Sequence, residues 1–498
     1  MNLTRTVGCV GAALVLAACT PTPEKPEASK VVEIPVTTAS EKAKQLFDEG
    51  QYLLDVGRGV DANKKFRAAI AEDPAFAYAY LNLSNSALSF KEFQDAVDQA
   101  SAKLEGKSEG ERLLVEISKT FLTNDSDRGL KLAQELVQKY PQSPRAHLAL
   151  AGIQTTRNEA QAARQSLDKA RELDPTSVAA VVTLGNSFLF NEPKDFAQAE
   201  TQTRRFIELK PNEAKAYEAL GDVKRAQKEL PSALEAYTQA TAKDPALAVA
   251  QLKKGHVNSF LGNFEQATAS YDAAIESAEP ESKATYANYR AFTQIHAGKI
   301  PAALTELKNV ADSVEKVGTP AHQVKGLKVF TLDNQATAAL HHAKLGEAEA
   351  AIAARNALQR EIAEEVGTED AKRLQQANCL MWDGLLAAYQ GRYDLARKKA
   401  EENAKLLEKD QNPRKMEAYH WVLGTVHLRK GDHAKAVEHL RQADHRNTMY
   451  IRYHLALAEE GAGNTAEAKR LFQEVAEWNF NSVGFALVRA DAAKRAGL

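Results

Sequence analysis

Two short glycine-containing segments match the spacing of loops that carry chemistry. Gly106-Lys107-Ser108-Glu109-Gly110 has the G-x-S-x-G spacing of a nucleophile elbow, in which a strained strand-to-helix turn presents a serine to an acyl group. Residues 57–62 have the G-x-G-x-x-A spacing that cradles a dinucleotide pyrophosphate when a strand precedes it. Here a segment with helical periodicity precedes each motif. We therefore interpret both as loops between helices, and we expect no catalytic residue.

Histidines gather near the C-terminus, where the chemistry of such a group would be metal binding. Six of the twelve lie there: His420, His427, His433, His439, His445 and His454. The first two share a helix face but lie about 10 Å apart along the axis, whereas zinc needs each ligand nitrogen within about 2.1 Å. The next three follow at steps of six residues, which turn them to different faces. We expect no metal and no other cofactor, but we expect this end to gain charge as pH falls toward 6.

A cysteine near the N-terminus lies at the end of a segment that favours lipid attachment. Arg5 supplies a positive charge, residues 7–16 are apolar, and Ala17-Ala18 provide small residues before Cys19, as in an export signal. The sequence Leu16-Ala17-Ala18-Cys19 resembles the lipobox of bacterial lipoproteins. The resemblance implies cleavage between Ala18 and Cys19 and attachment of diacylglycerol and an acyl chain, such as palmitate, to Cys19. The alternative is an ordinary secretory signal with a chance cysteine.

The residues after Cys19 extend this expectation. Thr20 stands where an aspartate commonly signals retention in the inner membrane, so the resemblance implies an outer-membrane lipoprotein facing the periplasm, given a Gram-negative source. Residues 19–40 contain four prolines among polar residues, which is typical of an extended, disordered tether. Within it, residues 31–36 form a short apolar stretch. This stretch either docks on the first helices or contacts a partner.

Composition narrows the function classes. The chain has 498 residues, is 44% hydrophobic and 26% charged, and carries a formal net charge of −2. A nucleic-acid-binding protein would be expected to show a basic stripe, and none is present. No long apolar run follows Cys19, which excludes a membrane-spanning helix after that residue. Cys379 stands alone in the body of the chain, and we expect it to be a small buried residue.

The elements that position these residues follow a period of about 34 residues. Small and aromatic residues recur at matching offsets: Gly50, Ala62, Phe66, Ala69, Pro74; then Gly221, Ala233, Tyr237, Ala240, Pro245; then Gly255, Ala267, Tyr271, Ala274, Pro280. Such a period is typical of stacked helical hairpins. Small residues let the two helices of a hairpin cross closely, and large ones fill the gap to the next. The pattern resembles the tetratricopeptide repeat (TPR).

The resemblance implies an all-α, TPR-type α-solenoid. We expect a right-handed superhelix of about twelve helical hairpins with a C-terminal capping helix. The hairpins are predicted to begin near Ala43, Ala77, Gly110, Pro144, Ala180, Ala214, Ala248, Ala284, Leu332, Ala377, Glu417 and Met449. Glycines are predicted in the turns inside the later hairpins, at Gly262, Gly298, Gly346, Gly391, Gly431 and Gly463.

The predicted organisation has five parts. These are a lipoprotein signal peptide (1–18), the Pro-rich disordered tether (19–40), a regular TPR array (41–281), a TPR array with longer, more divergent helices (282–481) and the capping helix (482–498).

In the TPR family, the first helix of each hairpin lines a concave groove. Carried over position by position, the resemblance implies these groove residues: Tyr78, Leu81, Asn85, Leu88, Lys215, Glu218, Asp222, Arg225, His256, Phe260, Asn378 and Tyr389. Such a mixed surface suits an extended peptide or a partner helix. Alternatively, some of these side chains pack between hairpins.

Together these features predict a lipid-anchored, non-enzymatic scaffold that binds other proteins in cell-envelope assembly or export. One alternative is a protein that binds glycans or small ligands, or an enzyme accessory subunit, built on the same helical repeats. That function would need a deep pocket lined by aromatic residues. The three tryptophans, Trp382, Trp421 and Trp478, all lie toward the C-terminus, and we expect them to pack between helices. A homo-oligomeric structural element is a second alternative.

Overall fold

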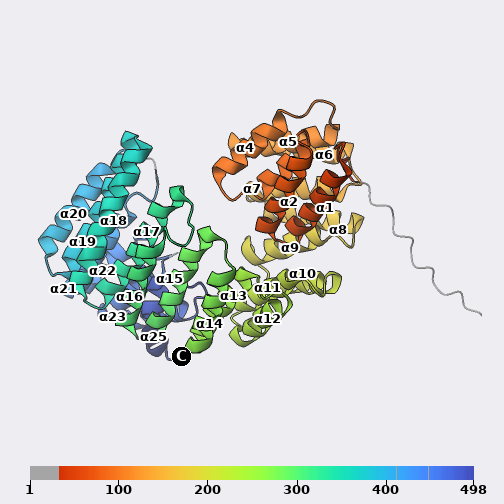
Figure 1. The fold of residues 1–498 in the computed structure, drawn as a ribbon. Helices are drawn as coiled ribbons and strands as arrows, with labels where there is room; N and C mark the ends of the chain where they lie inside the picture. The colour runs from red at the N-terminus through yellow and green to blue at the C-terminus, as the bar shows by residue number, and fades with distance from the viewer. Residues whose placement is uncertain (1–32, 411, 447) are drawn as a thin grey trace, which may run out of the picture.

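The protein is described here by a computed structural model that covers residues 33–410, 412–446 and 448–498. These residues form twenty-five α-helices and no strand (Figure 1). None of the helices in this part of the chain is both long enough and apolar enough to cross a bilayer. The predicted signal peptide, its cleavage site, Cys19 and the tether up to residue 32 lie outside the described residues.

The helices follow one another in antiparallel pairs, and each pair packs on the next. The first twelve are α1 (Glu41–Asp55), α2 (Gly59–Glu72), α3 (Ala77–Asn85), α4 (Phe90–Ser101), α5 (Glu109–Leu122), α6 (Ser126–Lys139), α7 (Pro144–Thr156), α8 (Ala160–Leu173), α9 (Val178–Phe190), α10 (Phe196–Leu209), α11 (Ala214–Ala226) and α12 (Leu230–Lys243).

The later helices are α13 (Ala248–Leu261), α14 (Phe264–Ser277), α15 (Pro280–His296), α16 (Ile300–Ser313), α17 (Ala321–His341), α18 (Leu345–Val366), α19 (Glu369–Tyr389), α20 (Tyr393–Leu406), α21 (Glu417–Lys430), α22 (His433–Leu440), α23 (Met449–Gly461), α24 (Thr465–Ala476) and α25 (Val483–Ala496). The predicted twelve hairpins are confirmed. The prediction of longer helices in 282–481 is confirmed for α17, α18 and α19, which have 21, 22 and 21 residues, and is wrong for α20 to α24, which have 8 to 14.

The small residues of the repeat are required by close contact inside each hairpin. A Cβ atom added to Gly50 would lie 2.8 Å from Cε1 of Phe66, and one added to Gly255 would lie 2.8 Å from Cε1 of Tyr271. Both rings are fully buried. The ring of one helix therefore fills the space left by the glycine of its partner, as the periodicity predicts.

Most hairpins turn through one residue in the left-handed conformation. Five of the six predicted turn glycines occupy it: Gly262, Gly298, Gly391, Gly431 and Gly463. The prediction is wrong for Gly346, which is the second residue of α18. In that hairpin Ala343 takes the left-handed position, with φ 53°.

The first hairpin contacts hairpins that follow much later in the array. Val56, between α1 and α2, is buried against Val181 and Phe206 of the α9–α10 hairpin. Arg58 lies 3.3 Å from Asp244, and Lys64 lies 2.5 Å from Glu279. The first hairpin therefore packs near the fifth (Figure 1) and is linked by ion pairs to the ends of the sixth and seventh. It forms one side of the groove on the concave face of the first half.

The N-terminal segment lies along the outside of α5. Ile34 is 3% exposed and packs against Leu113 and the backbone of Gly110. The backbone N–H and the hydroxyl of Thr37 donate hydrogen bonds of 2.8 and 2.7 Å to the carboxylate of Glu111. The docking alternative for the apolar stretch is confirmed at Ile34, and the expectation of a disordered tether is wrong for residues 33–40, because a buried apolar side chain and paired polar groups hold them. We call these residues the N-terminal strap.

The C-terminal helix does more than cap the end of the stack. α25 contacts α24 and α23 but also α15 and α17, which begin far earlier in the chain. Phe485, Val488 and Ala492 are fully buried. The expected capping helix is confirmed, since α25 packs on α24, and the helix also covers α15 and α17 on the concave face of the second half. The groove expected from the repeats is thereby interrupted in the second half.

Candidate functional site

Three adjoining cavities form one groove along the first helices of the early hairpins. Their volumes are about 390, 310 and 460 Å³. The first and second share Gly57, Val182 and Asn186. The second and third share Leu189, Phe190 and Asp222. We call them the first, second and third sections of the groove.

The first section has an apolar floor and a polar amide wall. Buried Tyr78 and Leu81 line it, and burial raises the pKa of Tyr78 to about 12, so the phenol stays neutral. The Asn82 amide donates to the side chain of Gln51 at 2.7 Å, and the Asn85 amide donates to Asn82 at 3.1 Å.

The charges of the first section cancel. Its charged residues are Asp55 and Arg145, and they are bonded to each other through both guanidinium nitrogens. Burial alone would lower the pKa of Arg145, but the bond to Asp55 raises it above its ordinary value. The section is therefore nearly neutral and rich in side-chain amides.

The second section is crossed by a buried ion network between α11 and α13. Lys215 lies 2.6 Å from Glu218, and Lys253 bonds both Glu218 and Asp222. Burial alone would raise the pKa of Glu218, but Lys253 and Lys215 lower it to about 2. The carboxylate stays charged and paired, so the network fixes the relative positions of the two helices.

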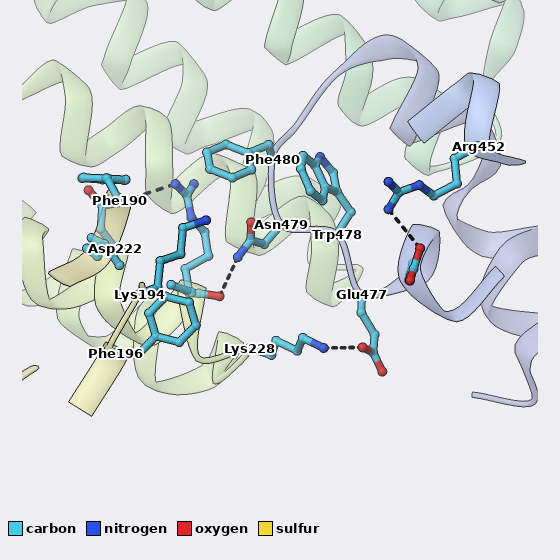
Figure 2. Close-up of a pocket in the computed structure, with 14 residues that line it drawn as sticks. Phe190, Lys194, Phe196, Asp222, Lys228, Arg452, Glu477, Trp478, Asn479 and Phe480 are labelled. Carbon is cyan, nitrogen blue, oxygen red and sulfur yellow. Dashed lines mark hydrogen bonds and ion pairs between the residues drawn. The ribbon is translucent and has the colours of Figure 1, made fainter. Parts of the chain in front are cut away.

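The third section is aromatic. Phe190 and Phe196 reach it from the α9–α10 turn, and Trp478 and Phe480 reach it from the extended connection between α24 and α25 (Figure 2). Lys228 is paired with Glu477, and Arg452 lies 3.1 Å from Glu474. Its rim is charged, but these rim charges are paired within the chain.

The structure places seven of the predicted groove residues along this groove. Tyr78, Leu81 and Asn85 line the first section, Lys215 and Glu218 the second, Asp222 the second and third, and Arg225 the third. Leu88 is 50% exposed and lines none of the three.

The expectation of an open groove is wrong for His256 and Phe260. Phe485 packs edge-on against the Phe260 ring at 5.4 Å, and Arg489 donates to the Phe260 carbonyl at 2.7 Å. Asn481 lies 3.4 Å from Nδ1 of His256 and donates to Tyr271. The chain's own C-terminal segment therefore covers both residues.

The two remaining predicted residues lie in the second half. The hydroxyl of Tyr389 lies 3.1 Å from that of Tyr450, so α23 partly covers it. Asn378 accepts a hydrogen bond from the buried Arg355 and lines a separate cavity of about 340 Å³ with Met381 and Trp421.

Several groove residues were missed from the sequence. Asn82 stands on α3 beside predicted residues, whereas Gln51, Asp55, Arg145 and Asn186 stand on α1, α7 and α9, for which no groove residue was predicted. Applying the repeat positions to every hairpin would have found part of them. Trp478 and Phe480 carry no such signal, because they follow the last hairpin. The expectation that all three tryptophans pack between helices holds only in part for Trp478, which packs against the C-terminal core but also lines the third section.

The motifs singled out for chemistry have structural roles. Ser108 caps α5 in a capping box with Glu111, and Gly57 makes the turn of the first hairpin with φ 85°. The interpretation of both segments as loops is confirmed. Cys379 is buried, as expected.

The histidines come closer together than their spacing suggested. Nδ1 of His420 lies 2.9 Å from Nδ1 of His439, on which His427 stacks at 5.5 Å. In the described part of the chain, no three His, Cys, Asp or Glu residues are grouped to hold a metal ion. The expectation of protonation near pH 6 is wrong for His454, because burial lowers its pKa to about 3. Burial also lowers the pKa of His420 and His439.

Family models match both halves of the chain. A tetratricopeptide repeat-like domain matches residues 100–259, and two tetratricopeptide repeat models match residues 47–110, 383–450 and 422–482, and residues 248–280. Such repeats are in general scaffolds for protein–protein interaction. No match is found among curated protein sequences.

Solved structures resemble the chain in part. The Cut9–Hcn1 hetero-tetramer of the APC/C is 15% identical over 91% of this chain and 76% of its own, with a TM-score of 0.41. A tetratricopeptide repeat protein from Parabacteroides merdae is 14% identical over 59% of this chain and 100% of its own, with a TM-score of 0.33. YrrB, described as a TPR protein with an unusual peptide-binding site, is 18% identical over 36% of this chain and 91% of its own, with a TM-score of 0.29. These scores are low, and the fold rests on the helices and the repeat matches.

Proposed function

We propose that this tetratricopeptide-repeat chain is a lipid-anchored scaffold of the cell envelope that binds an extended segment of another protein. The observation that carries the proposal is the division of the concave face. The groove of the first half runs through three adjoining sections, whereas α25 covers α15 and α17 on the concave face of the second half and leaves a separate cavity of about 340 Å³ there. The continuous groove of the first half is therefore our candidate binding site.

The lining of this groove favours a peptide backbone. An extended chain presents one N–H and one C=O at each residue, and a side-chain amide can donate to one and accept from the other. Asn85 and Asn186 are exposed in the first section, and within the described residues no hydrogen-bond partner meets the Asn186 amide. The buried Asp55–Arg145 pair leaves no free charge there, so a neutral segment fits better than a strongly charged one.

The N-terminal residues support the envelope location. Leu16-Ala17-Ala18-Cys19 provides the site for cleavage and lipid attachment, and Thr20 favours the outer membrane, with the solenoid facing the periplasm. The partners would then be proteins of envelope assembly or export. The scaffold itself performs no catalysis in this proposal.

Site-specific photo-crosslinking in intact cells tests the binding function. A benzophenone amino acid replaces Asn85 or Asn186 in the groove, and Lys131, exposed on the outer helix α6, serves as the control position. We expect protein adducts from both groove positions and not from Lys131, followed by identification with mass spectrometry. Adducts only from Lys131, or none at all, would contradict the proposal.

Metabolic labelling tests the anchor separately. We expect a palmitate analogue to label the wild-type protein, and Cys19→Ser to abolish both the label and membrane association after export. A Cys379→Ser variant is the matched control and should label normally, because that thiol is buried. Equal labelling of wild type and Cys19→Ser would refute lipidation at Cys19.

A further inference from the structure

The third section of the groove is built differently from the other two. We infer that it is an anchor pocket that selects an aromatic side chain near one end of the bound segment, and that residues 477–480 set this selectivity. The inference rests on the proposed function, since it names the chemistry that the groove recognises at one end.

Exposed aromatic rings converge on this cavity from two distant parts of the chain. Phe190, at the end of α9, is 57% exposed, and Phe480 is 51% exposed. The Trp478 ring lies 5.4 Å from the Phe480 ring and is tilted against it by 50°. Buried Leu189 contributes to the lining. Large apolar rings held in solvent around one concavity are typical of an interaction site.

The geometry of these rings favours another ring. Aromatic pairs are most stable in edge-to-face or offset arrangements with centroids 4.5–7 Å apart, and tilted walls accept a third ring in this way. The volume of about 460 Å³ falls within the range of pockets that enclose a bound group, and it leaves room for the backbone on either side of that ring.

The charges around the cavity argue against an ionic ligand. Asp222 accepts from the Tyr237 hydroxyl at 2.7 Å and is also bonded to Lys253. The Arg225 guanidinium lies 3.6 Å from Asp222 and 5.4 Å from the centre of the Phe480 ring. Because the ion pairs are satisfied within the chain, a charged group entering the cavity would lose hydration without gaining a free partner.

The third section forms one end of the groove. It continues directly from the second section, with which it shares Leu189, Phe190 and Asp222. Beyond it, the Asn479 amide donates to the Arg225 carbonyl at 2.9 Å, and Asn481 bonds the side chains of α13 and α14. The C-terminal segment thus closes the groove, and a segment entering from the first section ends against Trp478 and Phe480.

Selection of random peptides displayed on phage tests the inference with the purified mature chain. The wild type, Phe190→Ala and Phe480→Ala are compared. Phe90→Ala is the matched control, because Phe90 is 69% exposed on α4 and lines none of the three sections. Phe480 lies in the C-terminal segment, which also packs on α11 and α13, so its substitution alone does not separate loss of the ring from loss of that packing. Phe190 lies outside this segment, and two pocket variants are therefore used. Thermal melts establish that each variant is folded.

We expect the wild type to enrich peptides with Phe, Tyr or Trp near one end, and both pocket variants to lose that preference while Phe90→Ala keeps it. Synthetic copies of the enriched peptides should bind each pocket variant about tenfold more weakly than the wild type. The inference is overturned if the enriched peptides have no aromatic position, or if the pocket variants enrich the same aromatic position as the wild type. The proposed function still stands in that case. If no peptide is enriched, the proposed function fails, and the inference fails with it.

Discussion

The residue that turns a hairpin can limit its stability. Ala343 holds φ 53°, a conformation that disfavours residues with a Cβ atom, whereas the equivalent positions in α13 and α21 carry Gly262 and Gly431. Ala343→Gly should therefore raise the free energy of unfolding by up to about 1 kcal/mol. Urea denaturation followed by circular dichroism measures it.

Ala350→Gly is the matched control for this substitution. Ala350 is exposed inside α18, where glycine costs backbone entropy, so the same change should lower stability by about 1 kcal/mol. If both variants lose stability, the left-handed turn at Ala343 is not strained.

The ion network of the second section is expected to stabilise the fold, and removing one of its charges tests this. Lys253→Met removes the cation that bonds Glu218 and Asp222, and Glu218 is 2% exposed. Glu218 keeps Lys215 but loses the second cation that compensates its buried charge, so stability should fall by about 2 kcal/mol. Lys91→Met removes an exposed pair with Asp95 and should cost less than about 1 kcal/mol. Equal small losses in urea melts would show that the network is not structurally important.

At the scale of helices, the sequence predicts what repeats and misses what occurs once. The glycines opposite Phe66 and Tyr271 recur with the period, so the hairpins and their order follow from them. The N-terminal strap depends on contacts that occur once in the chain, those of Ile34 with Gly110 and Leu113 and of Thr37 with Glu111, and such contacts leave no periodic signal. The same holds for α25, whose buried residues show an amphipathic helix but not the surface that it covers.

The strap can be tested through the stability of α5. Ile34→Ala should lower the free energy of unfolding by about 2–4 kcal/mol, because it leaves a cavity beside Leu113 and Leu136. The variant should also be cut faster by a protease near residues 33–40. Leu88→Ala, at a residue 50% exposed, should have little effect. Unchanged stability and unchanged cleavage of Ile34→Ala would show that the strap is not bound in solution.

For the molecule as a whole, the superhelix decides which predicted groove residues stay accessible. Repeat positions identify the side chains that face inward, as for Tyr78 and Glu218. They do not show that the turn between α1 and α2 meets α9, nor that residues 477–496 return to cover Phe260. Both are contacts between distant parts of the chain, and each follows from superhelical curvature accumulated over many hairpins. The aromatic end of the groove was therefore invisible in the sequence.

Buried histidines predict how the whole fold responds to acid. Burial lowers the pKa of His296 and His341 to about 4 and that of His454 to about 3, from an ordinary value of 6.5. Below pH 6.5 these histidines bind protons in the unfolded chain but stay neutral in the folded chain. The free energy of unfolding therefore keeps its full value above pH 6.5 and decreases as the pH falls toward 4. Asp333 opposes this, because burial raises its pKa to about 6 despite Arg355, and protonation then favours the folded state.

The sizes of these two opposing contributions decide whether acid raises or lowers the stability of the fold. Between pH 7 and pH 5 the three histidines together remove about 5 kcal/mol, whereas Asp333 returns about 1 kcal/mol, so a net loss of about 4 kcal/mol is expected. Thermal melts at pH 7.5 and 5.0 should show a clear drop in Tm. His454→Phe keeps an aromatic ring but removes one titrating group, so its drop should be smaller by nearly half. The same Tm at both pH values would mean that these histidines are hydrated and that the core around α23 and α25 is more open than the structure shows.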